Sequence, residues 1–488
     1  MNSPNNSVAK SRRSKWLRTL LWTAACLISL VTLLWQWENW RSARELSVVH
    51  RRVVERLGTD DPFAFMPPKV SDDQNYFANP VFEGWLRVTR PETGRMKYTP
   101  PTNVLLPKDF IKPEILKTED GEIEGLDLDL WIKKRGAVSG ESPATVLARE
   151  LGDGDGLLPK LAEGLNKKIS IMKPGPQEAL ETAGANPWEA AFPDFQDMNG
   201  FQRQLDLHLR SAALVGDAKK TASVAQIMLR FSEAPARGGI IGCLVPLALY
   251  GITFEALHEA LSHPAWTEES LSRLQLQLAW FDDLENYEKA HACEILMMFR
   301  SLAYFREHPE ALNFGVRSGT ERAVTHFLAG HMPIGWHDAN VAFYADCMLD
   351  QLGPPGPDAW LGATARDEKV KQRSKEANAW PNPRRILGAV AIPHVGNITH
   401  AAAETLFHRR CLIIACALEK HRLKHDAYPV TLDSAKDDLK LFELSDPALP
   451  TQPLGYRLED GGYLLWSMGP DAKDDGGLKG KDWLWRMK

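Results

Sequence analysis

The hydrophobic pattern of the chain begins with one uncharged segment near the N-terminus. Residues 19–37 carry no charged side chain and follow a tail, residues 1–18, that has five basic residues and no acidic one. A helix rises about 1.5 Å per residue, so this segment would reach about 28 Å, close to the hydrocarbon thickness of a bilayer. Tryptophans flank it, as in segments whose indoles lie at a lipid–water interface (Trp16, Trp22, Trp35, Trp37 and Trp40).

Three interpretations of this segment compete. A cleaved signal peptide requires small residues at the cleavage site, but the apolar core runs directly into Trp35, Gln36 and Trp37. A buried core helix would be less uniformly apolar and would not follow a basic tail. We therefore predict an uncleaved signal anchor at residues 19–37, embedded in the lipid bilayer, and a cytoplasmic tail at residues 1–18.

The predicted orientation rests on the lengths of the flanking segments, because basic residues lie on both sides. Five arginines follow the apolar segment within residues 41–56, so the count of basic residues is balanced. A long following domain can be translocated largely regardless of its charge, whereas the preceding tail is short. We expect a single-pass protein of the inner cell membrane with its C-terminal bulk outside the cytoplasm.

Residues 38–142 divide into a charged helix and an irregular, proline-rich region. The helix is predicted over residues 38–58, where Gly58 ends it. Short β-like pieces follow, such as residues 84–89. In the segment 126–132 (LDLDLWI) apolar and acidic residues alternate, which predicts an amphipathic strand.

Residues 143–351 are predicted to form a helical domain. Apolar residues recur at spacings of three and four, most regularly over residues 196–350, and short polar turns join the segments. This pattern is typical of packed antiparallel helical hairpins. A first helix is expected to begin at Ser142 and Pro143 and to end at Gly152.

Two further segments of the helical region have a specific interpretation. The GDGDG sequence at residues 152–156 is interpreted as a loop, because Leu151 and Ala162 would occupy the first and last ligand positions of an EF-hand. Residues 352–393 are rich in proline and charge and are predicted to form a linker. One long helix is then expected over about residues 394–425.

Composition limits the functional classes. The formal net charge is −5, and no long basic run follows residue 20, which argues against nucleic acid as a partner. One of the six cysteines, Cys26, lies in the apolar segment, and the others form no CxxC pair. These others are interpreted as buried free thiols and not as a zinc site or a disulfide framework (Cys243, Cys293, Cys347, Cys411 and Cys416).

The C-terminal part carries the most specific pattern. Residues 417–433 end a helix in a Tyr-Pro-x-x-Leu turn, and residues 453–456 read Pro-Leu-x-Tyr. A strand is predicted over residues 461–469, which read Tyr-x-Leu-x-Ser-x-Gly from residue 463 and precede an acidic glycine-rich loop. This order resembles the C-terminal domain of the major pseudopilins of type II secretion. The resemblance covers about the last 90 residues and implies a small α+β domain at residues 394–488.

The resemblance also implies a metal site, since the final loop of that family binds calcium. Asp471, Asp474 and Asp475 could supply hard oxygen ligands around the turn at Gly476 and Gly477. A solvated acidic turn is the alternative interpretation, and the positive charge of Lys473 would weaken a calcium site. No other cofactor is expected.

Three segments contain histidines at spacings that could form an active site or a metal site. The histidines of HEALSH at residues 258–263 are five apart, so they do not match a zinc-protease helix. His400, Glu404 and His408 share one helix face and could in principle hold a metal. A third group lies within residues 326–346, and its side chains could line a hydrolytic cleft (His326, His331, His337, Asp338 and Asp346).

The sequence therefore predicts a mainly α-helical protein with one N-terminal transmembrane helix, a block of helical hairpins and a pseudopilin-like α+β domain. Envelope scaffolding or protein interaction, with partner proteins that the sequence does not identify, is the expected role. A subunit of a secretion or pilus-like assembly and an envelope hydrolase using residues 326–346 are the alternatives. No catalytic residue is assigned, since the chain contains no GxSxG, Walker A, GxGxxG or HExxH motif.

Overall fold

The computed structural model describes residues 5–82, 88–89, 97–98, 105–117, 123–136, 140–173, 175–183, 195–233, 238–280, 283–308, 333–354, 360–379, 382–393, 395–442 and 444–487. It is mainly helical, and the chain divides into two compact units. We call Met1–Asp60, Met298–Asp350 and Lys369–Pro393 the anchor unit. The body unit is made of Asp61–Met297, Gln351–Glu368 and His394–Lys488.

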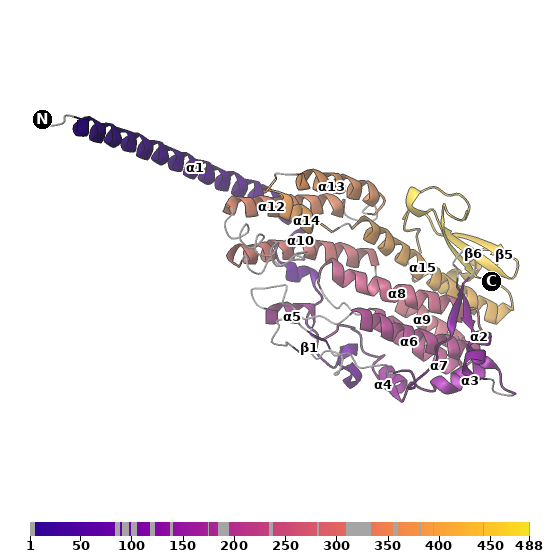
Figure 1. Ribbon diagram of the computed structural model, residues 1–488. Helices are drawn as coiled ribbons and strands as arrows, with labels where there is room; N and C mark the ends of the chain where they lie inside the picture. Colours follow the sequence, from indigo (N-terminus) through magenta and orange to yellow (C-terminus); the bar gives the residue numbers. More distant parts are fainter. Residues whose placement is uncertain are drawn as a thin grey trace. The chain divides into compact units, whose positions relative to one another are not determined.

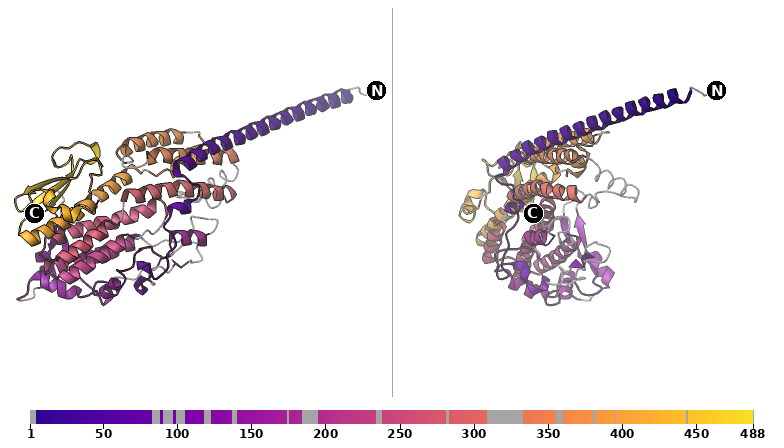
Figure 2. Two further views of the ribbon diagram at one scale, coloured as in Figure 1. Left: turned by 180° about the vertical axis from the view of Figure 1, so that it is seen from behind. Right: turned by 90° about the vertical axis from the view of Figure 1, so that its left-hand side faces the viewer.

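The anchor unit is built on helix α1, which runs without a break over Asn5–Leu57 (Figures 1 and 2). It ends where predicted, because Gly58 has a φ of 77° and its N–H donates to the carbonyl oxygen of Val54 at 2.8 Å. The anchor unit also contains most of α12 (Ile334–Leu352), the C-terminal parts of α10 (Asp283–Glu307) and α13 (Ala363–Asn378), and α14 (Ile386–Ala391). Helices α13 and α14 lie within residues 352–393, which we predicted to be a linker.

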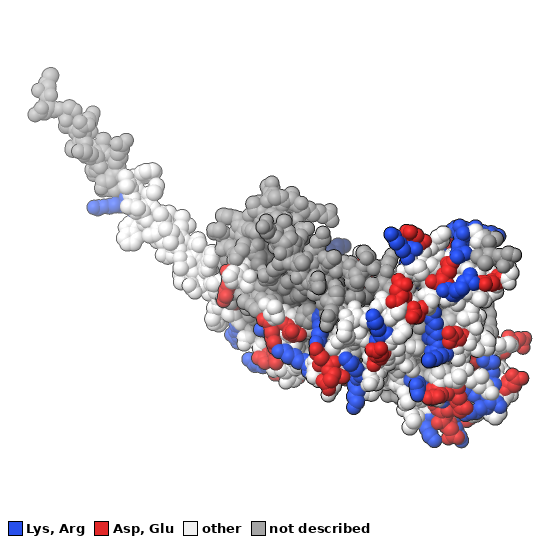
Figure 3. Space-filling model, turned by 90° about the horizontal axis from the view of Figure 1, so that it is seen from below, with Lys and Arg blue, Asp and Glu red and all other residues white. Residues whose placement is uncertain are grey.

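The apolar turns of α1 lie on the surface. None of the apolar window of this helix is buried, and its surface is largely free of charge in the space-filling view (Figure 3). Two other helical stretches are long and apolar enough to cross a membrane: 67% of the window in Ile240–Leu261 is buried, and 47% of the window in Ile386–His425, which contains α14 and the helix after it. The part of the chain that the structure describes thus has three candidate membrane-spanning stretches.

The body unit is organised around five helices that pack side by side (Figure 1). They are α6 (Phe195–Leu214), α7 (Ala218–Ser232), α8 (Ile240–Leu261), α9 (Glu268–Leu278) and α15 (Gly396–His425). Their facing side chains form one continuous core, for example Leu209, Met228, Leu257 and Leu274. The prediction of helices over residues 196–350 is confirmed for the part of that range that the structure describes, while residues 298–350 belong to the anchor unit. The long helix expected near residues 394–425 is confirmed as α15.

Polar caps explain where several of these helices begin. The Asp217 carboxylate accepts the N–H of Lys220 at the start of α7, and Thr267 forms a capping box with Ser270 at the start of α9. Helix α3 (Pro143–Leu151) begins at Ser142 and ends at Gly152, as predicted.

Short elements at residues 62–183 complete the body unit. They are the 3₁₀ helices η1 (Pro62–Phe65), η2 (Tyr76–Ala78) and η3 (Pro80–Phe82), the strand pairs β1 (Val88–Thr89) with β2 (Lys97–Tyr98) and β3 (Glu114–Lys117) with β4 (Ile123–Asp127), and the helices α2 (Leu128–Arg135), α3, α4 (Leu157–Glu163) and α5 (Pro176–Ala183). The GDGDG segment is a turn in which Asp153 accepts the N–H of Gly156 at 2.9 Å, which confirms its interpretation as a loop.

The predicted strand over residues 126–132 is wrong for most of its length. Strand β4 ends at Asp127, whose carboxylate accepts the N–H of Leu130 and caps helix α2. Trp131 is buried, and its Nε1 donates to the carbonyl oxygen of Ile111 at 2.6 Å. A helix cap and one buried indole therefore outweigh the alternation of apolar and acidic residues.

The C-terminal part consists of α15, the short helices η7 (Leu432–Ala435), α16 (Lys436–Leu439) and η8 (Gly469–Asp471), and a three-stranded antiparallel sheet. The sheet has the order β5 (Gly455–Glu459), β6 (Gly462–Ser467) and β7 (Trp483–Met487). Tyr463, Leu465 and Trp485 join the core with Phe407 and Cys411 of α15. The predicted strand near residues 461–469 is confirmed as β6.

All cysteines are free thiols. Cys26 is exposed on α1, and the five others are buried. This confirms the interpretation of those five as apolar core residues.

Candidate functional site: the acidic loop and the adjoining groove

The three predicted ligands lie in the loop that joins β6 to β7, and their side chains are exposed. Asp471 accepts the backbone N–H of Lys473 at 3.1 Å. Asp474 accepts the N–H of Gly476 at 2.9 Å and the indole N–H of Trp466 at 3.0 Å. These carboxylates therefore shape the turn by accepting hydrogen bonds from neighbouring donors.

Asp482 closes the same loop from its far end. It is buried, and its carboxylate accepts the N–H groups of Gly477 at 2.7 Å, Leu478 at 3.1 Å and Asp475 at 3.5 Å. The sequence places Asp482 just before the terminal strand, where a closing ligand could return to the loop of Asp471, Asp474 and Asp475.

The loop folds back over the outer face of the sheet. A Cβ at Gly477 would lie 2.9 Å from Leu464 and 3.3 Å from the ring of Trp466, and its φ is 76°. A Cβ at Gly455 would lie 2.1 Å from the same ring. Arg457 donates to the carbonyl oxygen of Gly476 at 3.1 Å. Glycine is required at these positions because the backbone passes directly over an indole.

The loop supplies the oxygen donors that calcium prefers, but the described side chains do not form a cage. Among the residues that the structure describes, no group of three or more His, Cys, Asp or Glu side chains could hold a metal ion. Asp474 and Asp482 already accept hydrogen bonds from the protein. The chemistry of the donors thus fits calcium, and Asp474 and Asp482 also stabilise the backbone of the loop.

The tyrosines of the C-terminal pattern converge in the core. Tyr428 lies edge-on to Tyr463 with ring centroids 5.0 Å apart, and the ring of Tyr456 lies 6.1 Å from that of Tyr463. The Tyr456 hydroxyl donates to the carbonyl oxygen of Pro429 at 2.5 Å, and burial raises the pKa of Tyr456 to about 12. The pattern that carries the resemblance therefore builds the fold of this part and keeps these phenols protonated.

Asp446 is a functional candidate that no motif in the sequence singles out. It is buried, and its carboxylate accepts the Ser467 hydroxyl at 2.6 Å, the Ala448 N–H at 2.7 Å and the Met468 N–H at 2.9 Å. The Asp-Pro pair at residues 446–447 is a turn signal that could have indicated this role. The carboxylate joins the segment before β5 to the end of β6.

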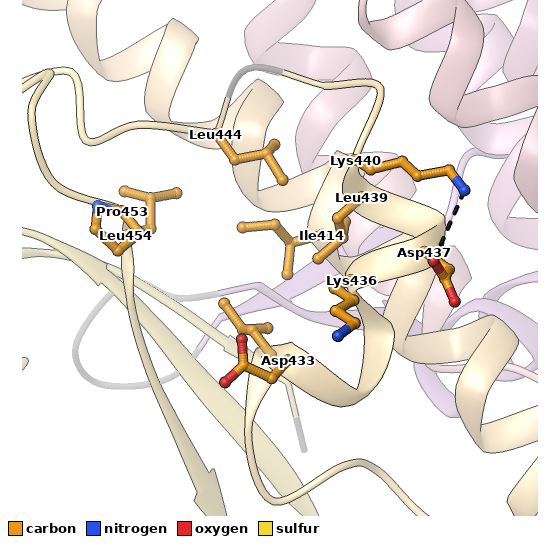
Figure 4. A pocket seen from close by; sticks show the side chains of 10 residues that line it. Ile414, Asp433, Lys436, Asp437, Leu439, Lys440, Leu444, Pro453 and Leu454 are labelled. Carbon is orange, nitrogen blue, oxygen red and sulfur yellow. Dashed lines mark ion pairs between the residues drawn. The ribbon is translucent and has the colours of Figure 1, made fainter.

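A groove of about 420 Å³ opens next to this segment (Figure 4). Apolar side chains from α15, η7, α16 and the segment before β5 line it (Ile414, Leu432, Leu439, Leu444, Pro453 and Leu454). The rim of the groove is charged. It carries Asp433, Lys436 and an exposed ion pair in which the Lys440 Nζ lies 3.7 Å from the Asp437 Oδ1. The groove can accept apolar side chains while the rim pairs with charges of either sign.

The other histidine candidates take structural positions. The ring of His258 lies 4.3 Å from that of Trp485, and its Nε2 lies 2.8 Å from the carbonyl oxygen of Arg486. The ring centroid of His408 lies 5.9 Å from that of Trp485, and the Nε2 atom of His408 lies 3.9 Å from the Oε1 atom of Glu404. The Nε2 atom of His400 lies 2.6 Å from the Thr364 hydroxyl.

The candidate hydrolytic region is described only in part. His326 and His331 lie outside the described residues, and His337 and Asp338 are buried. Asp346 forms ion pairs with Arg373 at 2.6 Å and with Arg52.

Its environment keeps Asp346 ionised. Burial raises the pKa of Asp346, but the hydrogen bonds and charges of Arg373 and then Arg52 outweigh burial, and the net effect lowers the pKa. An ion-paired carboxylate of this kind gives no support to a role as general acid or base.

Comparisons with protein-family models, curated proteins and solved structures find no match for this chain.

Proposed function

We propose that this protein is a single-pass membrane protein that scaffolds or binds other proteins outside the cytoplasm. The observation that carries the proposal is helix α1. None of its apolar window is buried, whereas its later turns form ion pairs and a hydrogen bond with other parts of the anchor unit. An exposed apolar surface of this length is unfavourable in water and favourable in a bilayer.

The contacts of the later turns support a rigid tether. Arg384 pairs with Glu38 at 3.1 Å and with Glu45 at 2.7 Å. The Asn39 side chain accepts the N–H of Gly335 at 2.8 Å. One continuous helix would thus lead from the bilayer directly into folded protein.

Packing favours α1 over the other two candidate spans. The apolar residues of α8 contact α6, α7 and α15, so burial in the body unit accounts for its composition. Helix α15 carries buried charged side chains, among them Arg409, Glu419 and Lys420. Charged residues of this kind are costly in the centre of a bilayer.

The C-terminal part supports the scaffolding half of the proposal. A long helix followed by a three-stranded antiparallel sheet is the order that the pseudopilin resemblance implies. The apolar groove beside that sheet has the chemistry to receive a side chain of a partner protein. The same resemblance is compatible with a subunit of a secretion or pilus-like assembly, and a neighbouring gene for a secretion ATPase or prepilin peptidase would favour that alternative.

Fractionation and protease accessibility test the proposal. We expect the full-length protein in the inner-membrane fraction after an alkaline wash. Protease added to spheroplasts should remove most of its mass. A soluble full-length product would contradict the anchor, and complete protection from protease would contradict the orientation.

A further inference from the structure

We infer that the face of α1 just beyond its apolar turns is a binding surface for anionic phospholipid headgroups, with Arg41 and Arg44 as the phosphate ligands. The inference rests on the proposed anchoring of α1 and adds the class of lipid that the helix selects.

Two faces of α1 have different surroundings at this level. Glu38, Ser42 and Glu45 lie on one stripe at spacings of four and three, and each contributes to the polar contacts with Arg384. Trp37, Arg41 and Arg44 lie on a neighbouring stripe with the same spacing and are exposed. One side of the helix therefore contacts folded protein, and the other side is exposed.

Each arginine on the open side lies against a tryptophan. The guanidinium carbon of Arg41 lies 5.4 Å from the ring centroid of Trp37, and that of Arg44 lies 5.8 Å from the ring centroid of Trp40. The two indoles are 53% and 60% exposed. A cation–π contact orients a guanidinium and leaves its N–H donors available, so both arginines are held ready for an acceptor.

The arginines of α1 differ in their partners. Arg52 forms an ion pair with Asp346 within the anchor unit. Arg41 and Arg44 form no ion pair with any residue that the structure describes. Two positive charges therefore stand together beside an apolar segment without an ion-pair partner in the described part of the chain.

The distance along the helix places these charges at headgroup depth. At about 1.5 Å per residue, Arg41 lies about 6 Å and Arg44 about 10 Å beyond Trp37. The polar zone on each side of a bilayer is about 5–8 Å thick. A guanidinium can donate two parallel hydrogen bonds to a phosphate, and the flexible arginine stem can reach back toward the membrane. The net positive charge selects an anionic headgroup over a zwitterionic one.

Lipid selection by the full-length protein tests the inference. The protein is reconstituted into nanodiscs of phosphatidylcholine alone and of phosphatidylcholine with an equal amount of phosphatidylglycerol, and the lipids retained after mild delipidation are quantified by mass spectrometry. We expect enrichment of phosphatidylglycerol over the bulk ratio. The double variant Arg41→Gln/Arg44→Gln should lower the enrichment by about fivefold for each arginine removed, the equivalent of about 1 kcal/mol each.

The matched control is Arg51→Gln/Lys473→Gln, which removes the same charge away from the headgroup zone and should leave the enrichment unchanged. Equal enrichment in the wild type and in the Arg41/Arg44 variant would overturn the inference, as would displacement of the bound lipid by inorganic phosphate. Failure to enter either nanodisc would instead overturn the proposed anchor. Stable insertion without lipid preference would overturn only the present inference.

Discussion

At the scale of single residues, the acidic side chains of the C-terminal loop act first on their own backbone. Asp471, Asp474 and Asp482 each accept at least one backbone N–H, and Asp474 also accepts the indole N–H of Trp466. Turns of this kind gain stability because the carboxylate satisfies donors that the tight backbone cannot pair. Calcium binding would require at least some of these oxygens to change partners.

Thermal melting of the full-length protein tests the prediction that the C-terminal acidic loop binds calcium. If the loop binds calcium, millimolar calcium should raise the melting temperature relative to chelator, with an affinity near the weak extracellular range of about 10⁻⁴–10⁻³ M because Lys473 offsets part of the acidic charge. The variant Asp474→Ala/Asp475→Ala should melt equally in calcium and in chelator. Equal melting of the wild type in both conditions would show that the loop is only an acidic turn.

The buried imidazole of His208 predicts a pH dependence of stability. Its Nε2 lies 2.9 Å from the carbonyl oxygen of Leu105. Burial lowers the pKa of His208 from 6.5 to about 4, which the hydrogen bond to Leu105 opposes only in part. Between pH 6.5 and 4 the unfolded chain binds a proton that the folded protein does not. The free energy of unfolding should therefore fall as the pH drops through this window, by on the order of 3 kcal/mol.

Denaturant unfolding at pH 7 and pH 5 measures this effect. His208→Gln removes the titrating group while its amide can still donate to Leu105, so the loss of stability at pH 5 should become smaller. His425→Gln changes an exposed histidine and should leave the pH dependence as it is. An unchanged pH dependence in His208→Gln would contradict the assignment.

At the scale of elements, buried ion pairs set how the helices of the body unit pack. Arg409 on α15 donates to both carboxylate oxygens of Asp283 on α10, at 2.8 and 3.1 Å, and to the carbonyl oxygen of Leu278 at 3.2 Å. Its guanidinium also lies 4.2 Å from the ring of Tyr250. The pair fixes one position of α15 along its neighbours, since a shift would leave two charges buried apart.

Breaking this pair should be costly. Arg409→Met removes the guanidinium that neutralises Asp283 and should lower the free energy of unfolding by about 3–5 kcal/mol. The double variant Arg409→Met/Asp283→Leu replaces both charges by apolar groups and should recover most of the loss. Denaturant titration measures the free energy of unfolding of the wild type, the single variant and the double variant. A double variant as unstable as the single one would show that packing, and not the unpaired charge, causes the loss.

At the scale of the whole molecule, attachment to the membrane should depend on α1 alone among the three candidate spans. Arginine in the centre of a spanning helix costs about 2.5–3.5 kcal/mol per residue. Leu27→Arg/Leu30→Arg should therefore release protein into the soluble fraction while its circular dichroism remains helical. Leu276→Arg, at an exposed position of α9, should stay in the membrane fraction. Membrane retention of the α1 variant would mean that another helix anchors the protein.

The surface of the folded part carries both signs of charge. On the face drawn in Figure 3, lysine and arginine alternate with aspartate and glutamate over the folded part of the chain. The formal net charge of −5 is small for this length. Neither feature favours a polyanion as the partner of the folded part.

Several features were predictable because their causes lie within a few residues of sequence. The uncharged run at residues 19–37 is complete in itself, and no distant contact is needed to recognise it as apolar. Helix ends at Gly58, Ser142 and Gly152 follow from caps and positive-φ glycines that act over one turn. The five buried cysteines followed from their apolar surroundings and irregular spacing.

Other features depended on contacts that join distant parts of the chain, which periodicity alone does not specify. The alternation at residues 126–132 suited a strand, but the Asp127 cap and the site that buries Trp131 near Ile111 selected a helix. The pairing of Arg409 with Asp283, the lining of the groove and the stacking of Gly455 under Trp466 arise only when the elements meet. The sequence by itself thus determined local helices, their ends and the uncharged apolar run at residues 19–37. The tertiary structure decided which buried charges pair and where a groove opens, because those depend on complementary side chains brought together by long-range packing.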